Sequence, residues 1–346
     1  MQTKRLIITG DEKHDQAVYD EAAALIRAGE LVAFPTETVY GLGANALDAK
    51  AVKKIYEAKG RPSWNPLISH VSSRAMLDSL VREYPADFEV LAKYFMPGPL
   101  TFLLPKTTIV PDEVSAGLDA TTVRMPKHPV ALRLIETAGV PIAAPSANRS
   151  GRTSPTTAAH VLEDLDGRIA AVIDGGASDV GVESTVIDIM QNPPMILRPG
   201  GVTKEEIEAV LGRPVTVFKA AAEGTSKKGL PSPGMTLRHY APNAQLINTG
   251  DTEDALMLEL AKQLETGKRV GILLPSDWKL PSKYASSKAI MVFDYGSWSD
   301  WGTMARRVFD GLRTLDKQGV QVILGPLPPE QGLGLALRDR LLRAAK

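Results

Sequence analysis

Short apolar runs alternate with amphipathic stretches along both halves of this chain, and this alternation constrains the fold more than any other feature. In the first half, a predicted helix over 16–28 ends at Gly29 and leads into a buried strand at 31–34. In the second half, predicted strands at 244–248 and 270–274 flank a helix over 254–264. Strand–helix alternation of this kind predicts an α/β fold in each half.

The chain is long enough for two domains. A length of 346 residues exceeds one ordinary hydrophobic core. Residues 220–229 are small, polar and aperiodic, which is typical of a linker. We therefore predict a first domain over 1–218, a linker over 219–242 and a smaller domain over 243–346. The second half has no G-x-G-x-x-G after a strand, so no motif there supports a dinucleotide site.

Composition excludes several classes of protein. Basic and acidic residues balance at 40 each, which gives no case for a protein that coats nucleic acid. The absence of cysteine excludes disulfides, thiolate metal sites and cysteine nucleophiles. The first eight residues lack a long apolar stretch, and no apolar run approaches the roughly 20 residues of a membrane span. We expect a soluble, cytoplasmic protein.

The segment 59–67 carries two cations on a stiff backbone. Lys59 and Arg61 lie two residues apart, and Pro62 and Pro66 restrict the loop between a helix and a strand. A mobile ammonium and a planar guanidinium together can hold two oxygens of a polyphosphate. Taken alone, the segment also fits a solvated turn after a helix.

Four other segments combine small polar residues with short strands and turns. Two are loops, at 34–43 and 144–155, that follow predicted strands, where α/β folds place ligands. The third is the Glu-Ser pair that opens the strand at 185–189, and the fourth is Arg124 inside an apolar strand, a pattern that Arg198 repeats. A buried arginine needs either a structural carboxylate or an anionic ligand. Each segment taken alone also fits a structural role.

Common catalytic motifs are missing. The chain has no G-x-x-x-x-G-K-[ST], no H-E-x-x-H and no G-x-S-x-G. With only five histidines, a catalytic metal caged by protein side chains is not expected.

Taken together, these segments resemble the threonylcarbamoyl-AMP synthase family, also called YrdC-like proteins. The resemblance covers about residues 5–215 and rests on K-G-R-P-x-x-N-P-L, P-T-E-T-V-Y-G-L-G, P-G-P-L-T, V-R-M-P and P-S-A-N-x-S-G, in that family's arrangement. Residues 232–242 and 333–341 look like the interdomain linker and C-terminal helix of the long, two-domain form. The implied architecture is an open α/β domain with a twisted mixed sheet around a basic cavity, plus a smaller Rossmann-like α/β domain.

The resemblance also implies a reaction. L-Threonine, bicarbonate or CO2, and ATP give threonylcarbamoyl-AMP and pyrophosphate, which makes the enzyme a nucleotidyltransferase. A tRNA threonylcarbamoyl-transferase complex would then use the product to make N6-threonylcarbamoyladenosine in tRNA. Mg²⁺ would be carried by the ATP phosphates rather than by a protein cage. Weak tRNA or RNA binding is a further expectation, and membrane binding is not expected.

The resemblance assigns roles to individual residues. Lys59 and Arg61 would be catalytic, since they would hold the triphosphate and the charge that develops on pyrophosphate. The threonine substrate would be bound by Thr36, His70, Arg124, Ala144 and Ser184. The nucleotide would be bound by Lys59, Ser63, Asn65, Ser146, Asn148, Ser154, Arg198 and Tyr240. No general base is assigned.

Tyr240 has two interpretations. It lies in an Arg-His-Tyr run before a proline and, by resemblance, could fold over the cavity as a lid that shields a labile adenylate from water. We favour the lid; the alternative is a plain connector in which Tyr240 is an aromatic anchor.

Two other functions compete with the synthase. An RNA-binding module would bind RNA without threonine and with strong salt dependence. A carbamoyl-transfer enzyme of the hydrogenase-maturation type would carry a Cys-rich zinc segment, which a chain without cysteine cannot form.

Overall fold

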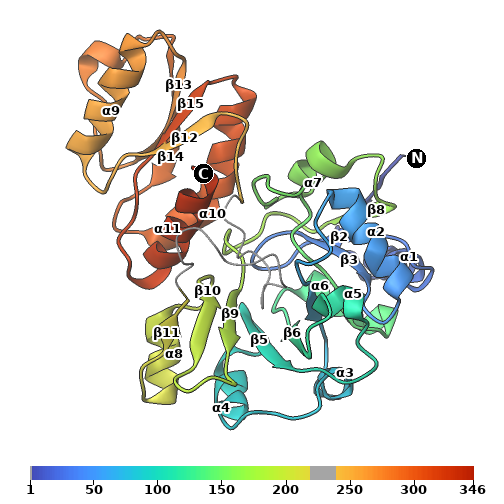
Figure 1. The fold of residues 1–346 in the computed structure, drawn as a ribbon. Helices are drawn as coiled ribbons and strands as arrows, with labels where there is room; N and C mark the ends of the chain where they lie inside the picture. Colours follow the sequence, from blue (N-terminus) through green and yellow to red (C-terminus); the bar gives the residue numbers. More distant parts are fainter. Residues whose placement is uncertain (1, 219–238) are drawn as a thin grey trace. The chain divides into compact units, whose positions relative to one another are not determined.

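The chain folds into two compact α/β units, each built on its own sheet (Figure 1). The computed structural model describes residues 2–218 and 239–346. Of these, the first unit holds 2–150, 155–179 and 183–218, and the second holds 151–154, 180–182 and 239–346. The predicted fold class is therefore confirmed. The linker predicted over 219–242 lies outside the described residues as far as 238, and the predicted domain boundaries stay a prediction.

The first unit contains a mixed sheet of eleven described strands in the order β1-β8-β2-β3-β7-β4-β6-β5-β9-β10-β11. Its strands are β1 (Lys4–Ile7), β2 (Val32–Phe34), β3 (Gly41–Asn45), β4 (Ile68–His70), β5 (Leu100–Pro105), β6 (Ala120–Arg124), β7 (Ile142–Ala143), β8 (Ala171–Asp174), β9 (Thr185–Asp188), β10 (Met195–Arg198) and β11 (Thr216–Val217). Its helices are α1 (Glu12–Arg27), α2 (Ala49–Lys59), α3 (Arg74–Leu80), α4 (Asp87–Phe95), α5 (Asp112–Ser115), α6 (Pro129–Ala138), α7 (Ala158–Leu165) and α8 (Lys204–Leu211).

Helices cover both faces of this sheet. Helices α1 and α6 pack on one face, against the apolar side chains of β2, β7 and β8. Helices α2, α4, α7 and α8 bury their apolar residues in a second, larger core on the other face. With both faces covered, β2 and β5 are buried along their whole length and β6 at all but its first residue, so functional side chains are expected at strand ends and in turns.

The second unit has a four-stranded parallel sheet in the order β12-β15-β13-β14. Its elements are β12 (Gln245–Asn248), α9 (Glu253–Glu265), β13 (Val270–Pro275), η1 (Ser282–Tyr284), β14 (Ile290–Gly296), α10 (Trp301–Lys317), β15 (Val322–Gly325) and α11 (Gly332–Ala344). Helix α9 packs on one face of this sheet, and α10 packs against β13, β14 and β15. This is the smaller Rossmann-like domain that was expected.

Candidate functional site

The turn after β2 brings a carboxylate and two hydroxyls to a buried guanidinium. Arg124 ends β6 and is 3% exposed. Its Nη1 donates to Thr38 Oγ1 at 2.9 Å, its Nη2 lies 2.7 Å from Glu37 Oε1, and its Nε donates to the carbonyl of Gly98 at 3.1 Å. Thr36 Oγ1 lies 2.8 Å from Thr38 Oγ1. Arg124 is thus held from three sides in one orientation.

Burial sets the charge states around this ion pair. Burial alone would raise the pKa of Glu37, but the Arg124 guanidinium outweighs it and holds that pKa below its usual range. His70 ends β4 directly beside Arg124 in the parallel register. Burial, with the Arg124 charge adding to it, lowers the pKa of His70 to about 3. His70 is therefore a neutral imidazole at physiological pH.

The buried, neutral His70 predicts a pH dependence of stability. Because the folded state depresses the pKa of His70, this imidazole is protonated below about pH 6.5 in the unfolded chain but only below about pH 3 in the folded chain. The contribution of His70 to folding stability is therefore fully present above pH 6.5 and is lost as the pH falls. Between pH 7 and pH 5 this group alone should remove about 2 kcal/mol of unfolding free energy. Urea denaturation at both pH values should show a smaller difference in His70→Gln than in the wild type. An equal difference in the two proteins would contradict the prediction.

Lys59 lies at the last turn of α2 and reaches a second loop. Gly60 ends this helix in the left-handed conformation at φ 64°, which glycine adopts without strain. The Lys59 side chain is buried, and its Nζ donates to the carbonyls of Ser146 and Asn148. Burial, with a smaller contribution from the Arg61 charge, lowers the pKa of Lys59 well below its ordinary value. Lys59 therefore joins the two loops that the sequence assigned to nucleotide binding.

Arg61 braces its own loop. Its Nη2 donates to Asn65 Oδ1 at 2.6 Å and to the carbonyl of Pro66 at 2.9 Å. Tyr56 donates its hydroxyl hydrogen to the carbonyl of Asn65 at 3.2 Å. Asn65 is buried by these contacts, whereas Ser63 is exposed. Contact of these residues with a triphosphate stays a prediction.

The loop after β7 is fixed by backbone pairing. Ala147 N donates to the carbonyl of Tyr40 at 2.8 Å, and Ala144 N donates to the carbonyl of Ile68 at 2.9 Å. Ser146 Oγ donates to Asn148 Oδ1 at 2.5 Å, which orients both side chains. The predicted residues of this loop thus lie beside β3 and the end of α2.

Ser184 and Arg198 meet at the start of β9. Arg198 donates from Nε and Nη2 to the carbonyl of Ser184, and Nη2 lies 3.1 Å from Ser184 Oγ. Ser184 Oγ also lies 2.7 Å from Thr101 Oγ1. A predicted threonine-binding residue and a predicted nucleotide-binding residue are therefore in contact.

Strand order explains how these groups converge. β4 and β6 are parallel, β5 is antiparallel to β6, and β9 is parallel to β5. The carboxyl ends of β4 and β6 and the amino ends of β5 and β9 therefore lie at the same end of these four neighbouring strands. His70, Arg124, Thr101 and Ser184 follow one another along that end.

Two predicted nucleotide-binding residues belong to the second unit. Ser154 is fully buried there. Tyr240 is 1% exposed, with its ring centroid 5.6 Å from that of Phe309 and the Arg340 guanidinium 5.0 Å above it. Its φ of 65° is a left-handed conformation that a bulky residue rarely adopts. These contacts fit the aromatic-anchor interpretation, and a lid movement stays a prediction.

Sequence reasoning missed Glu37 as a site residue. Thr36 was assigned to the site, but the neighbouring carboxylate of Glu37 was not. The sequence had nevertheless indicated that a buried Arg124 needs a partner. A single acidic residue between two threonines that follow a buried strand was the available signal.

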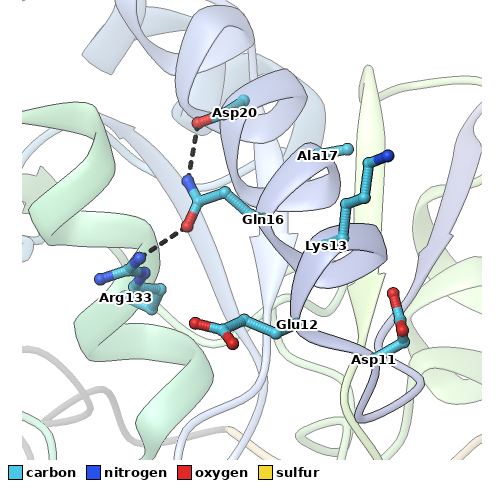
Figure 2. Close-up of a pocket in the computed structure, with 7 residues that line it drawn as sticks. All are labelled: Asp11, Glu12, Lys13, Gln16, Ala17, Asp20 and Arg133. Carbon is cyan, nitrogen blue, oxygen red and sulfur yellow. Dashed lines mark hydrogen bonds between the residues drawn. The ribbon is translucent and has the colours of Figure 1, made fainter.

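A surface hollow lies between α1 and α6, apart from the residues discussed above (Figure 2). It is lined by Asp11, Glu12, Lys13, Gln16, Ala17, Asp20 and Arg133. Gln16 bridges Asp20 and Arg133 by hydrogen bonds. None of the residues assigned from the sequence lines it, so it carries no candidate chemistry.

Two searches cover only the residues that the structure describes. Across 2–218 and 239–346, no three His, Asp or Glu side chains gather as they would around a metal ion. In the same ranges, no helix has the length and apolar character needed to cross a membrane.

Comparison with known proteins adds the family. Residues 24–200 match the Sua5/YciO/YrdC family model, described as telomere recombination, and residues 202–346 match the C-terminal domain model of threonylcarbamoyl-AMP synthase. The threonylcarbamoyl-AMP synthase of Pyrococcus abyssi is 48% identical over 98% of this chain and 97% of its own. The chain belongs to the threonylcarbamoyl-AMP synthase family. The resemblance inferred from the sequence is thereby confirmed.

Two other matches cover nearly the whole chain. The Bacillus subtilis threonylcarbamoyl-AMP synthase is 45% identical over 100% of this chain and 98% of its own. A crystal structure of P. abyssi Sua5 complexed with L-threonine matches with a TM-score of 0.89 and 48% identity, covering 100% of this chain and 98% of the other. Both units of the chain therefore have counterparts in the long form of the family.

Proposed function

We propose that this chain is an L-threonylcarbamoyladenylate synthase, a nucleotidyltransferase that makes threonylcarbamoyl-AMP and pyrophosphate from L-threonine, bicarbonate or CO2, and ATP. The observation that supports the proposal is that the first unit contains three buried polar groups: the Arg124 cluster, the contact of Lys59 with Ser146, and the Ser184–Arg198 pair. The L-threonine bound to a relative 48% identical supports the amino acid substrate. The product would serve N6-threonylcarbamoyladenosine modification of tRNA in the cytoplasm, through a tRNA threonylcarbamoyl-transferase complex.

The chemistry explains this set of side chains. In the proposed path, the threonine amine is carboxylated and the new carboxylate attacks the α-phosphorus of ATP. Every reactant carries negative charge, so the protein contributes chiefly by positioning the reactants and neutralising charge. Lys59 and Arg61 would face the triphosphate, and Arg124 would face the threonine carboxylate. The neutral His70 beside Arg124 can accept or donate one hydrogen bond without adding charge.

Magnesium enters this proposal with the substrate. Among the residues that the structure describes, no three metal-ligating side chains gather. The ion would be bound by the ATP phosphates, which it usually prefers as ligands.

Pyrophosphate release from ATP tests the proposal. With Mg²⁺ and bicarbonate present, release by the wild-type chain should require L-threonine and should stop when bicarbonate and CO2 are removed. Release that ignores threonine would contradict the proposal and favour another carbamoyl transfer. No release, together with RNA binding that weakens steeply with salt, would favour an RNA-binding module with weak tRNA affinity.

A further inference from the structure

The two carboxylate oxygens of Glu37 differ in their contacts with the described residues. Oε1 lies 2.7 Å from Arg124 Nη2 and accepts a hydrogen bond from Lys127 N at 3.1 Å. Oε2 is buried and has no hydrogen-bond partner among residues 2–218 and 239–346. A buried carboxylate oxygen without a donor is costly, and native proteins rarely keep one unless a ligand or water completes it. Within the described part of the chain, Oε2 is therefore able to accept a hydrogen bond from a bound ligand.

The surroundings of Glu37 match an α-amino acid. The Glu37–Arg124 pair presents one negative and one positive charge in a single buried site. An α-amino acid carries the complementary pair, an ammonium and a carboxylate two bonds apart. Arg124 is oriented by Thr38 and Gly98 as well as by Glu37, so its guanidinium stays in place if a substrate carboxylate takes over the charge. If the substrate carboxylate pairs with Arg124 and the substrate ammonium pairs with Glu37, neither buried charge is left uncompensated.

We propose that Glu37 is a catalytic residue: its Oε2 binds the ammonium group of the amino acid substrate and accepts the proton that the amine must lose before carboxylation. This inference rests on the proposed function. One N–H bond breaks, its electrons remain on nitrogen as the lone pair that carboxylation needs, and the proton moves to Oε2. Overall, an ammonium and a bicarbonate give a carbamate, one water and one proton, so the enzyme must hand that proton on to water.

Electrostatics favours this transfer only when substrate is bound. In the free protein, Arg124 holds the pKa of Glu37 below its usual range. A substrate carboxylate at Arg124 would cancel that positive charge, while the burial that raises the pKa would remain. The other titratable groups that act on Glu37 are His70 and His128, and burial lowers the pKa of both, so neither adds a compensating charge near neutral pH. Substrate binding thus converts Glu37 from an ion-pair partner into a base.

The first experiment uses Glu37→Gln in full-length protein and measures pyrophosphate release against threonine and ATP separately. We expect kcat/KM for threonine to fall about 100-fold, with KM for ATP within about threefold of wild type. The variant's rate should recover roughly tenfold per pH unit at alkaline pH, because solution then supplies the deprotonated amine, whereas the wild-type rate should stay flat. Glu30→Gln, which removes a surface carboxylate paired with Lys54, should behave as wild type.

Two results would overturn the inference: kcat/KM for threonine within threefold of wild type, or a loss with no alkaline recovery. A second measurement needs no variant and stands if Glu37→Gln does not fold. Wild-type protein should bind 2,3-dihydroxybutyrate, in which a hydroxyl replaces the ammonium, at least about 100-fold more weakly than L-threonine by calorimetry. Equal binding would also overturn the inference. If the wild type releases no threonine-dependent pyrophosphate, the proposed function itself fails.

Discussion

Lys59→Ala should lower threonine-dependent pyrophosphate release by about 1,000-fold or more. The side chain removed is a buried lysine whose Nζ donates to the carbonyls of Ser146 and Asn148. Its loss would remove the charge proposed to face the triphosphate and would leave two carbonyls without their donor. The loop that carries Ser146 and Asn148 would then lose its side-chain contact with α2 and keep the backbone hydrogen bond from Ser150 N to the carbonyl of Lys59. Initial rates at saturating ATP and threonine measure the effect.

Two further variants separate charge from folding. Lys54→Ala removes another lysine from α2, but that side chain is 41% exposed and pairs with Glu30 at the surface. It should change neither the rate nor the melting temperature appreciably. Lys59→Arg keeps the charge with a different shape and should recover only part of the rate. If Lys59→Ala stays folded by circular dichroism and keeps more than a tenth of the activity, Lys59 is not the phosphate contact.

The fold was predictable where local signals and burial agreed. The sequence predicts a helix over 49–58, and α2 is observed at Ala49–Lys59, because Asp48 caps its start and Gly60 ends it. Helix α1 begins at Glu12, four residues before the predicted start, because the side chain of Asp11 accepts a hydrogen bond from His14 N and caps the helix there. The sequence contained this cap, but the apolar pattern used to find the helix begins only in its second turn.

Among the strands that were not predicted, β3 and β14 were missed for reasons that lie outside local sequence. Strand β3 is rich in glycine, and its sequence looks like a turn. A Cβ on Gly43 would lie 2.8 Å from both Ile142 and Phe34, so glycine is required there by neighbouring strands rather than by a turn. Strand β14 lies at the edge of its sheet and is only partly buried, which obscures its apolar pattern.

The candidate site was predictable by residue type but not by pairing. Residue type and local pattern singled out Lys59 and Arg124, and the family resemblance added Ser146. They could not show that Lys59 contacts a loop 87 positions away, or that Arg124 contacts Thr38 across 86 positions. Such contacts follow from the order of strands in the mixed sheet, which no local pattern encodes. Glu37 was overlooked for the same reason, since its importance comes only from its distance to Arg124.

Arg124→Ala should both destabilise the first unit and abolish threonine binding. Removing one partner of a buried ion pair leaves the other charge uncompensated, which typically costs about 3–5 kcal/mol of unfolding free energy. Here the remaining charge is the buried Glu37 carboxylate, one oxygen of which already has no donor in the described part of the chain. Arg82→Ala, which removes an arginine from an exposed pair with Asp119, should have little effect. Denaturant unfolding and threonine calorimetry measure the two effects.

The pH dependence of this variant separates the ion pair from a packing defect. In the wild type the pKa of Glu37 is depressed, so its contribution to stability is present above its unfolded value and lost as the pH falls. In Arg124→Ala only burial acts on Glu37, so its pKa should rise above the unfolded value and the folded chain should take up a proton as the pH falls. The stability deficit relative to wild type should therefore shrink between pH 7 and pH 5. Adding Glu37→Gln to Arg124→Ala should recover part of the stability at pH 7 without restoring threonine binding. A deficit that is equal at both pH values and unchanged in the double variant would mean that Arg124 stabilises the unit by packing alone.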